Sequence, residues 1–355
     1  MLTTVGLILG YTCNSKCRHC LWGDTLQDES KMSFEDVCHY IDSMSELQTA
    51  REVIFSGGEP FLFRDVMTEG ISYAYRRYNL SAAVTTNSFW ATSRQQAQDV
   101  LGDLCARGLR RMQTSVDDFH QEYVPFERAA NAVHAAIDLK IKCTVIVVAT
   151  NKSKRRDYYV NALEIDSADD VDVLEVQATP VGYASSRIDR SDYALRGEVP
   201  ADICAVLEAI SILPDGSVQV CCGPPLPSKE LNAGNARSER LADIIARAEW
   251  NPIFNALSLA KGPAILVNEL EKLGKHRDLQ PGYASPCDAC QHILSGLKLG
   301  PELEAALGKR QAELYFLRLL ADTARAENNN KTPVLELIPQ PREACPELAT
   351  PTGAV

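Results

Sequence analysis

Short apolar runs alternate with longer amphipathic stretches through the first half of the chain. The runs have the length of buried strands, and they lie at 3–9, 52–56, 82–86, 110–116, 143–149 and 171–176. Helical segments follow them, including 33–47, which opens with Ser33 and Asp36 as a capping box, 93–107 and 125–139. Strands that alternate with helices form a parallel sheet with right-handed crossovers. In such α/β folds, functional side chains gather at the carboxyl ends of the strands.

Three cysteines follow the first apolar run on one loop. Cys13, Cys17 and Cys20 have the spacing C-x3-C-x2-C. Thiolates are the ligands of iron–sulfur clusters, and three of them leave one iron of a cubane without a protein ligand. An open metal position is a binding position for another group. The trio therefore favours a catalytic cluster; part of a zinc site, or burial as small apolar side chains, are the alternatives.

A Gly-Gly-Glu-Pro turn ends the second apolar run. Gly57 and Gly58 allow close approach of the backbone to a ligand, and the carboxylate of Glu59 is a partner for an ammonium group. With the cysteine trio, this turn resembles the radical S-adenosylmethionine (SAM) superfamily. The resemblance implies that a [4Fe–4S] cluster on the three cysteines binds SAM, with the methionyl amino group at the Gly-Gly-Glu turn. It also implies a partial (β/α)6 TIM-like barrel, which we assign to residues 1–185.

Polar side chains at other strand ends are candidates for contacts with SAM. They are Thr85, Asn87, Ser115 and Gln177. Ser115, with Asp117, has the position to hydrogen-bond the ribose. His19 stands where the family has an aromatic residue near the adenine. For each of them, an ordinary turn or surface position is the alternative.

Asp117 belongs to a second group at the same end of the sheet. Asp118 and His120 follow it closely, so two carboxylates and an imidazole meet there. Such a group orients a substrate or moves protons. Capping of the next helix is an equal alternative. We assign Asp117 to the catalytic residues.

A second set of cysteines lies in the later part of the chain. Cys204 and Cys221 enclose a hairpin turn in the arrangement C-x11-G-x4-C, and Cys287-Asp-Ala-Cys290 follows. Four thiolates suit one iron–sulfur cluster or one zinc ion. The spacing resembles the SPASM and twitch extensions of radical SAM enzymes, which favours the cluster. Because only one further cysteine, Cys345, follows, we expect the twitch form with a single auxiliary [4Fe–4S] cluster.

These patterns divide the chain into four parts. We assign 186–298 to the twitch-like domain, 299–327 to one long C-terminal helix and 328–355 to a loose tail. The apolar stripe of this helix contains Leu307, Leu314, Leu317 and Leu320. Cys222 has no ligand role in this scheme, because neighbouring residues point to opposite sides of a strand. Three roles for Cys222 stay open: a hydrogen-atom donor at the barrel mouth, a small buried side chain, or the ligand of the auxiliary cluster in place of Cys221.

Charge and composition limit the partners. The formal net charge is −11, which argues against nucleic acid, since phosphate binding needs a basic surface. Residues 1–10 have no positively charged n-region and are too short to span a bilayer. We therefore expect a cytoplasmic protein without a membrane contact. In a reducing compartment its 12 cysteines serve metals or redox chemistry rather than disulfides.

The resemblance implies an enzyme in which SAM is cleaved reductively to a 5′-deoxyadenosyl radical that removes a hydrogen atom from a C–H bond. We expect the substrate to be a ribosomally made peptide that is epimerised, with a cysteine thiol as hydrogen donor, or cross-linked. Oxidation of a small alcohol, sugar or aminocyclitol is the alternative. A reductase such as flavodoxin or ferredoxin would supply electrons. A non-enzymatic iron–sulfur protein is disfavoured by the Gly-Gly-Glu turn.

Overall fold

A single sheet organises the computed structural model of the chain, which describes residues 2–47, 49–166, 171–199, 204–221, 229–259 and 262–329. Six strands are parallel and neighbour one another in sequence order. They are β1 (Thr4–Ile8), β2 (Glu52–Ser56), β3 (Ser81–Thr86), β4 (Leu109–Ser115), β5 (Lys142–Ala149) and β6 (Val171–Gln177). Each lies where an apolar run predicted a strand, and the boundaries differ by one residue or less. The partial (β/α)6 barrel expected from the sequence is confirmed.

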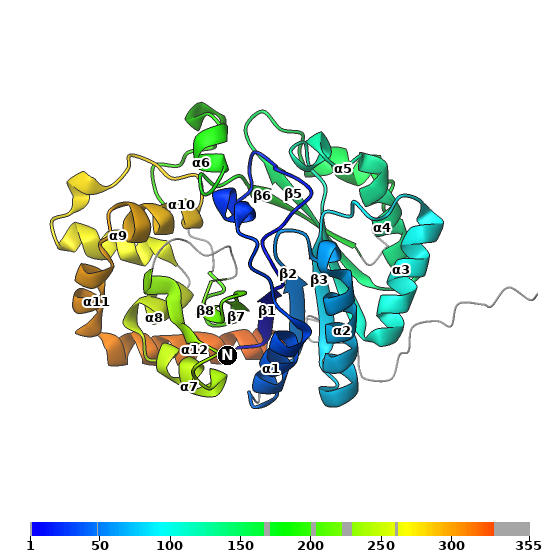
Figure 1. Cartoon of the computed structure of the whole chain (residues 1–355). Helices are drawn as coiled ribbons and strands as arrows, with labels where there is room; N and C mark the ends of the chain where they lie inside the picture. The colour runs from blue at the N-terminus through cyan, green and yellow to red at the C-terminus, as the bar shows by residue number, and fades with distance from the viewer. Residues whose placement is uncertain are drawn as a thin grey trace, which may run out of the picture.

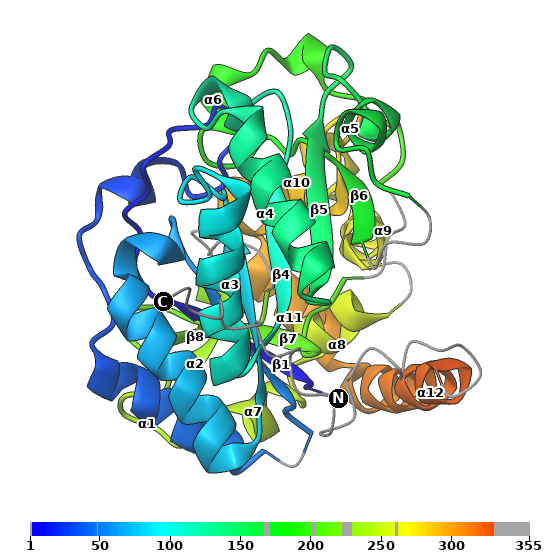
Figure 2. The same cartoon turned by 90° about the vertical axis from the view of Figure 1, so that its right-hand side faces the viewer.

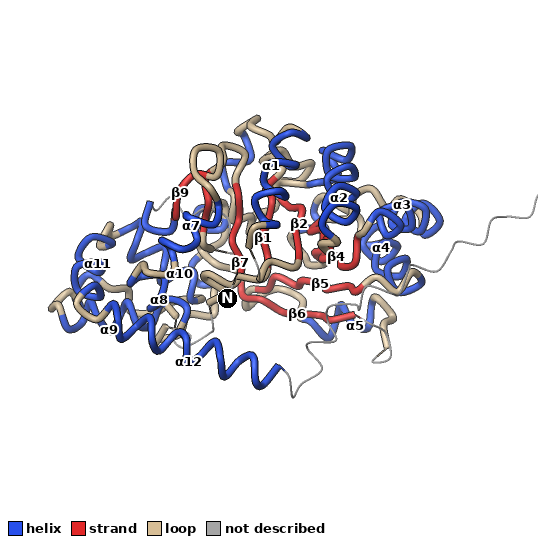
Figure 3. Tube along the Cα trace, turned by 90° about the horizontal axis from the view of Figure 1, so that it is seen from below, coloured by secondary structure: helices blue, strands red, loops and turns tan. Residues whose placement is uncertain are grey.

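Helices cover the outer side of this curved sheet (Figures 1 and 3). They are α1 (Phe34–Ser45), α2 (Arg64–Tyr78), α3 (Arg94–Arg107), α4 (Phe126–Asp138) and α5 (Arg156–Ala162). Figure 2 shows α1 to α4 side by side in front of the sheet. The main core lies between these helices and the sheet, and Phe55 of β2 and Tyr40, Met67 and Ile71 of the helices are fully buried in it. Burial of this apolar surface holds each helix on the sheet.

The start of α1 has the predicted capping box. The Ser33 side chain accepts a hydrogen bond from the Asp36 N–H at 3.1 Å, and the Asp36 carboxylate accepts one from the Ser33 N–H at 2.9 Å. Two backbone donors at the helix start are satisfied in this way. The loop between β1 and α1 is therefore anchored at its far end, and its near end carries the cysteine trio.

A hairpin extends the sheet beyond β1. Strand β7 (Ala209–Ile212) pairs in parallel with β1, and β8 (Ser217–Gln219) and β9 (Asn232–Asn235) follow in antiparallel pairing. The turn between β7 and β8 contains Gly216 at φ +87°, a conformation that glycine adopts without strain. The predicted hairpin is present, but it continues the barrel sheet. The pairing of β7 with β1 thus joins residues from both sides of residue 186, where we expected a domain boundary.

The C-terminal helices gather on the other side of the molecule (Figure 1). After the short α6 (Ala184–Arg187), they are α7 (Leu241–Ala248), α8 (Pro252–Ser258), α9 (Pro263–Lys272), α10 (Pro286–Cys290), α11 (Gly300–Gly308) and α12 (Gln311–Asn329). Among the described residues, no helix combines the length and the apolar character that crossing a membrane requires.

The expectation of one long helix over 299–327 is wrong. The segment forms α11 and α12, with a break at Lys309 and Arg310. Gly308 weakens the helix at this point because it adds backbone freedom. Arg310 then pairs with Glu313 in the first turn of α12, at 2.8 Å. The predicted apolar stripe divides with the helix: Leu307 and Leu314 are buried, whereas Leu320 is half exposed. The predicted tail 330–355 lies outside the described residues.

Candidate active site

The three cysteines of the first loop lie at the carboxyl end of β1. Cys17 is buried, and Cys13 and Cys20 are partly buried. The loop is held internally by the Ser15 N–H, which donates to the Cys13 Sγ at 3.4 Å, and by the Cys20 N–H, which donates to the Cys17 carbonyl at 3.0 Å. Burial, with the neighbouring Cys20 and Glu59, raises the pKa of Cys13 to about 12. Three buried or partly buried thiols on one loop suit a positively charged metal group, which stabilises their thiolates.

The Gly-Gly-Glu turn packs directly on this loop. The Gly58 N–H donates to the Gly10 carbonyl at 2.9 Å, and the Glu59 N–H donates to the Thr12 carbonyl at 3.0 Å. A Cβ atom on Gly58 would lie 2.2 Å from the Tyr11 carbonyl oxygen. The glycine is therefore required for the backbone of the turn to contact the backbone of the cysteine loop. Approach to a ligand, the role expected from the sequence, stays a prediction.

Glu59 turns inward beneath the two motifs. Its side chain is 1% exposed, and its carboxylate accepts three hydrogen bonds: from the Phe61 N–H at 3.1 Å, the Thr86 hydroxyl at 2.8 Å and the Asn87 N–H at 2.7 Å. Burial raises the pKa of Glu59 to about 7, against these three donors. A carboxylate offers about four acceptor positions. One is left for an ammonium group, and the predicted contact with SAM remains untested.

The polar strand ends line up along the same edge of the sheet. Thr85 donates to the Gln113 side chain of β4 at 3.2 Å, and both are partly buried. Ser115 ends β4 and Gln177 ends β6, with β5 between them. Because side chains alternate along a strand, Thr85, Gln113 and Ser115 share the face opposite to the helices. Asn87 differs, since its amide faces Asn14 of the cysteine loop at 2.8 Å.

Asp117 and His120 form a pair against the first cysteine loop. Asp117 is fully buried and accepts from the N–H groups of Phe119, His120 and Val148 at 3.0 to 3.2 Å. Its carboxylate also lies 2.9 Å from the His120 Nδ1. Burial would raise the pKa of Asp117, but His120 and the hydrogen bonds outweigh it and lower the pKa to about 2. Asp117 thus caps the turn at 120–122 and orients the His120 ring. Its role in orienting a substrate or moving protons stays a prediction.

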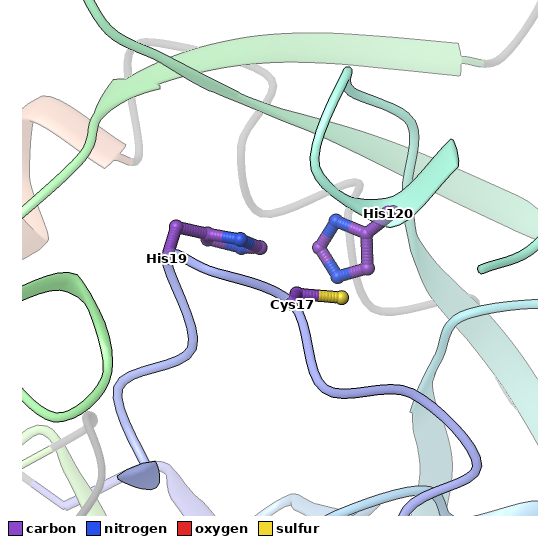
Figure 4. Close-up of side chains that lie close together, drawn as sticks. All are labelled: Cys17, His19 and His120. Atoms are coloured by element: carbon purple, nitrogen blue, oxygen red, sulfur yellow. The ribbon is translucent and has the colours of Figure 1, made fainter. Parts of the chain in front are cut away.

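His19 lies close to His120 and Cys17 (Figure 4). Its ring stacks on Phe119 with centroids 5.0 Å apart and meets the edge of His120 at 4.7 Å. Burial lowers the pKa of His19 to about 3, so the ring is neutral. One ligand atom from each of Cys17, His19 and His120 lies within 4.8 Å of the others. The alternative of an exposed loop position for His19 is wrong, because the residue is only 9% exposed.

Basic side chains between residues 152 and 155 lie near acidic side chains. Lys152 pairs with Asp192, Lys154 lies near Asp118, and Arg155 pairs with Glu175. Asp118 points away from Asp117 and accepts from the Tyr159 hydroxyl at 2.7 Å. These side chains form a solvated, ion-paired surface beside the barrel mouth.

The later cysteines meet at one cavity. The side chains that line this cavity are thiols or apolar groups. They are Leu21, Val181, Cys204, Val206, Cys221, Leu231, Leu257, Pro263, Pro286, Cys287 and Cys290. Cys290 is buried, and its pKa is raised well above the usual value by burial and by Cys287 and Cys204. Leu21 follows Cys20 directly, so the first loop forms part of this wall. Cys222 and Cys345 lie outside the described residues.

Both cysteine groups fit the metal groups expected from the sequence. The second offers four thiol ligands around an apolar cavity, the surroundings in which buried clusters are held. At the first, the buried Nδ1 of His19 has no hydrogen-bond partner among the described residues, as expected beside a site for a further group. Thr86 was not among the residues predicted from the sequence, although its hydroxyl donates to Glu59. The position of Thr86 next to Asn87 at a strand end was the available signal.

Comparisons with known proteins agree with this geometry. Residues 7–157 match the model of the Radical SAM superfamily. No curated protein matches the chain. A solved structure of anSMEcpe with bound AdoMet and the Cp18Cys peptide is similar over 87% of this chain and 99% of its own, at 13% identity and a TM-score of 0.52.

Two further solved structures are similar over less of the chain. BtrN in complex with AdoMet and 2-DOIA covers 69% of this chain and 82% of its own, at 12% identity and a TM-score of 0.43. SuiB of Streptococcus suis bound to S-adenosylmethionine covers 69% and 65%, at 12% identity and a TM-score of 0.47. The match to the Radical SAM superfamily thus covers residues 7–157, which include the first cysteine loop and the Gly-Gly-Glu turn.

Proposed function

We propose that the protein is a radical SAM enzyme with two [4Fe–4S] clusters. The ligands of the SAM-binding cluster are Cys13, Cys17 and Cys20, and those of the auxiliary cluster are Cys204, Cys221, Cys287 and Cys290. The observation that carries this proposal is the meeting of four cysteines, up to 86 positions apart, at one apolar cavity. Their cavity shares Leu21 with the first cysteine loop, so the two centres are neighbours. A zinc ion on the same four thiolates is the alternative that the test below separates.

The bound cluster and SAM supply a 5′-deoxyadenosyl radical that removes a hydrogen atom from a C–H bond of the substrate. The residues of this chain hold and orient the participants. The Gly57–Glu59 turn would receive the methionyl group of SAM, and His19, Thr85, Ser115 and Gln177 would contact its nucleoside. Asp117 keeps the His120 ring in place at the mouth, where the ring moves a proton or aligns the substrate.

For the substrate we propose a ribosomally made peptide, with epimerisation or cross-linking as the outcome. The anSMEcpe structure, which shares the fold, holds a peptide, so this architecture accommodates one. Oxidation of a small alcohol, sugar or aminocyclitol is the second candidate, favoured by a single auxiliary set of cysteines within the described residues. An acidic electron carrier such as flavodoxin or ferredoxin would deliver the electron, from a cytoplasmic pool.

Iron counting and SAM cleavage test the proposal. The anaerobically loaded protein should bind about eight irons and form 5′-deoxyadenosine with dithionite. Alanine at Cys13, Cys17 and Cys20 together should leave about four irons and abolish deoxyadenosine formation. Alanine at the four later cysteines should also leave about four, with SAM-binding cluster spectra retained. As a control, Cys38→Ala on α1 should change neither quantity.

Two results would overturn this assignment. Deoxyadenosine formation by the triple variant would remove the first loop from the catalytic centre. Retention of all the iron, with loss of zinc, in the variant of the four later cysteines would replace the auxiliary cluster by a zinc site.

A further inference from the structure

Asn87 connects the parts of the proposed SAM-binding centre. It follows β3 directly and is 7% exposed. Its backbone N–H donates to the Glu59 carboxylate at 2.7 Å. Its side-chain Nδ2 lies 2.8 Å from the Asn14 Oδ1, 3.5 Å from the Ser15 Oγ and 3.9 Å from the Cys13 Sγ. One residue thus contacts both the Gly-Gly-Glu turn and the cysteine loop.

The direction of the Asn87 amide is determined by its surroundings. Its Oδ1 accepts a hydrogen bond from the Phe89 N–H at 3.0 Å, so the NH2 group must face the cysteine loop. The next residue, Ser88, is fully buried at φ +62°, a left-handed conformation that is uncommon outside glycine. Ser88 is held there by Thr86, at 3.0 Å from its N–H, and by the Thr114 hydroxyl at 2.7 Å. A strained turn that is held on both sides is typical of functional sites, because it fixes the side chain beside it.

We infer that Asn87 is a positioning residue for the SAM-binding cluster, whose amide donates a hydrogen bond to the Cys13 sulfur and favours the reduced state of that cluster. The inference rests on the proposed function. One hydrogen of the amide goes to the short bond with Asn14, which leaves the other for Ser15 and Cys13. The Ser15 N–H is a second donor to the same sulfur, at 3.4 Å.

The physical reason is the charge of the cluster. Reduction adds one electron, which spreads over the iron and its thiolate sulfurs. A hydrogen bond to such a sulfur is stronger in the more negative state, so it favours reduction. The sequence predicted that Asn87 contacts SAM. In this proposal its amide instead contacts the Cys13 sulfur, which is a ligand of the cluster.

A redox titration followed by electron paramagnetic resonance tests the inference. Asn87→Leu keeps the branching at Cγ and removes the donor, and Asn87→Asp keeps an oxygen for Phe89 but turns a carboxylate oxygen towards Cys13. At a fixed potential near the wild-type midpoint, the reduced-to-oxidised ratio of the cluster that responds to SAM should fall about fivefold in Asn87→Leu. It should fall further in Asn87→Asp. The auxiliary cluster of the same molecules should keep its ratio.

Asn161→Leu on α5 is the matched control, because Asn161 is exposed and far along the chain from both cysteine loops. It should leave both ratios unchanged. An unchanged ratio for the SAM-responsive cluster in Asn87→Leu and Asn87→Asp, at full iron content, would overturn the role of Asn87 alone. Absence of any SAM-responsive cluster in the wild-type protein would overturn the proposed function, and this inference with it.

Discussion

Replacement of Glu59 by Gln separates the hydrogen bonds of this buried carboxylate from its charge. The Gln oxygen can still accept from the Phe61 N–H and the Thr86 hydroxyl, which share one oxygen of Glu59. The Gln NH2 group would then face the Asn87 N–H, which loses its acceptor. An unpaired buried donor costs about 1–3 kcal/mol of folding stability. At low pH, Glu59→Gln should therefore be less stable than the wild type by roughly that amount.

The negative charge that Glu59 gains as pH rises lowers the stability of the wild type, whereas the variant gains no such charge. Burial raises the pKa of Glu59 from 4.5 to about 7. The folded state then binds this proton more tightly than the unfolded state. The stability that this group contributes to the wild type is therefore fully present below about pH 4.5 and is lost as pH rises through about 7. A shift of this size is worth about 3 kcal/mol. Gln has no proton to lose and stays neutral, so the stability gap between the variant and the wild type should close, or reverse, between pH 5 and pH 8.

Urea unfolding followed by circular dichroism at pH 5 and pH 8 measures this gap. Glu69→Gln is the control, since Glu69 on α2 is largely exposed and its contact with Arg107 is long, at 3.4 Å. Exposed pairs of this kind contribute about 0–1 kcal/mol. A gap that stayed constant or widened towards pH 8 would show that burial does not penalise the Glu59 charge. The reasoning from burial would then be refuted.

SAM binding by the loaded Glu59→Gln variant is a separate readout. If Glu59 receives the ammonium group of SAM, we expect a loss of about 2–5 kcal/mol in binding free energy. Unchanged SAM affinity in the folded variant would limit the role of Glu59 to its hydrogen bonds within the protein. Gly58→Ala should destabilise the protein by about 1–3 kcal/mol and reduce iron loading at the first loop, since a Cβ would lie 2.2 Å from the Tyr11 oxygen; urea unfolding and iron analysis check this, with Gly197→Ala, where the added Cβ would meet no atom within 4 Å, as the control. If Cys222 quenches a substrate radical, product made in heavy water should carry one solvent deuterium and Cys222→Ala should still form deoxyadenosine without delivering that deuterium. A product two hydrogens lighter, or deuterium uptake undiminished in Cys222→Ala, would remove the donor role and favour oxidation.

Local patterns in the sequence were sufficient for the elements that depend on neighbouring residues. The apolar runs predicted six parallel strands, and the Ser33–Asp36 spacing predicted the start of α1. Strand length, helix capping and turn type depend on residues a few positions apart, which is why they can be predicted from the sequence. The break at Gly308 was missed because a continuous apolar stripe masked it.

Contacts between distant residues were decided only by the tertiary structure. The sequence determined which side chains could bind metal or SAM: the thiol spacing, the Gly-Gly-Glu turn and the polar strand ends. It could not determine that Gly58 contacts the cysteine loop, that Asn87 faces Cys13, or that Asp117 holds His120 against His19. Nor could it show that the later hairpin joins the sheet at β1. The orientation of a side chain depends on hydrogen bonds and packing with segments far along the chain, and these form only when the sheet brings the strand ends together.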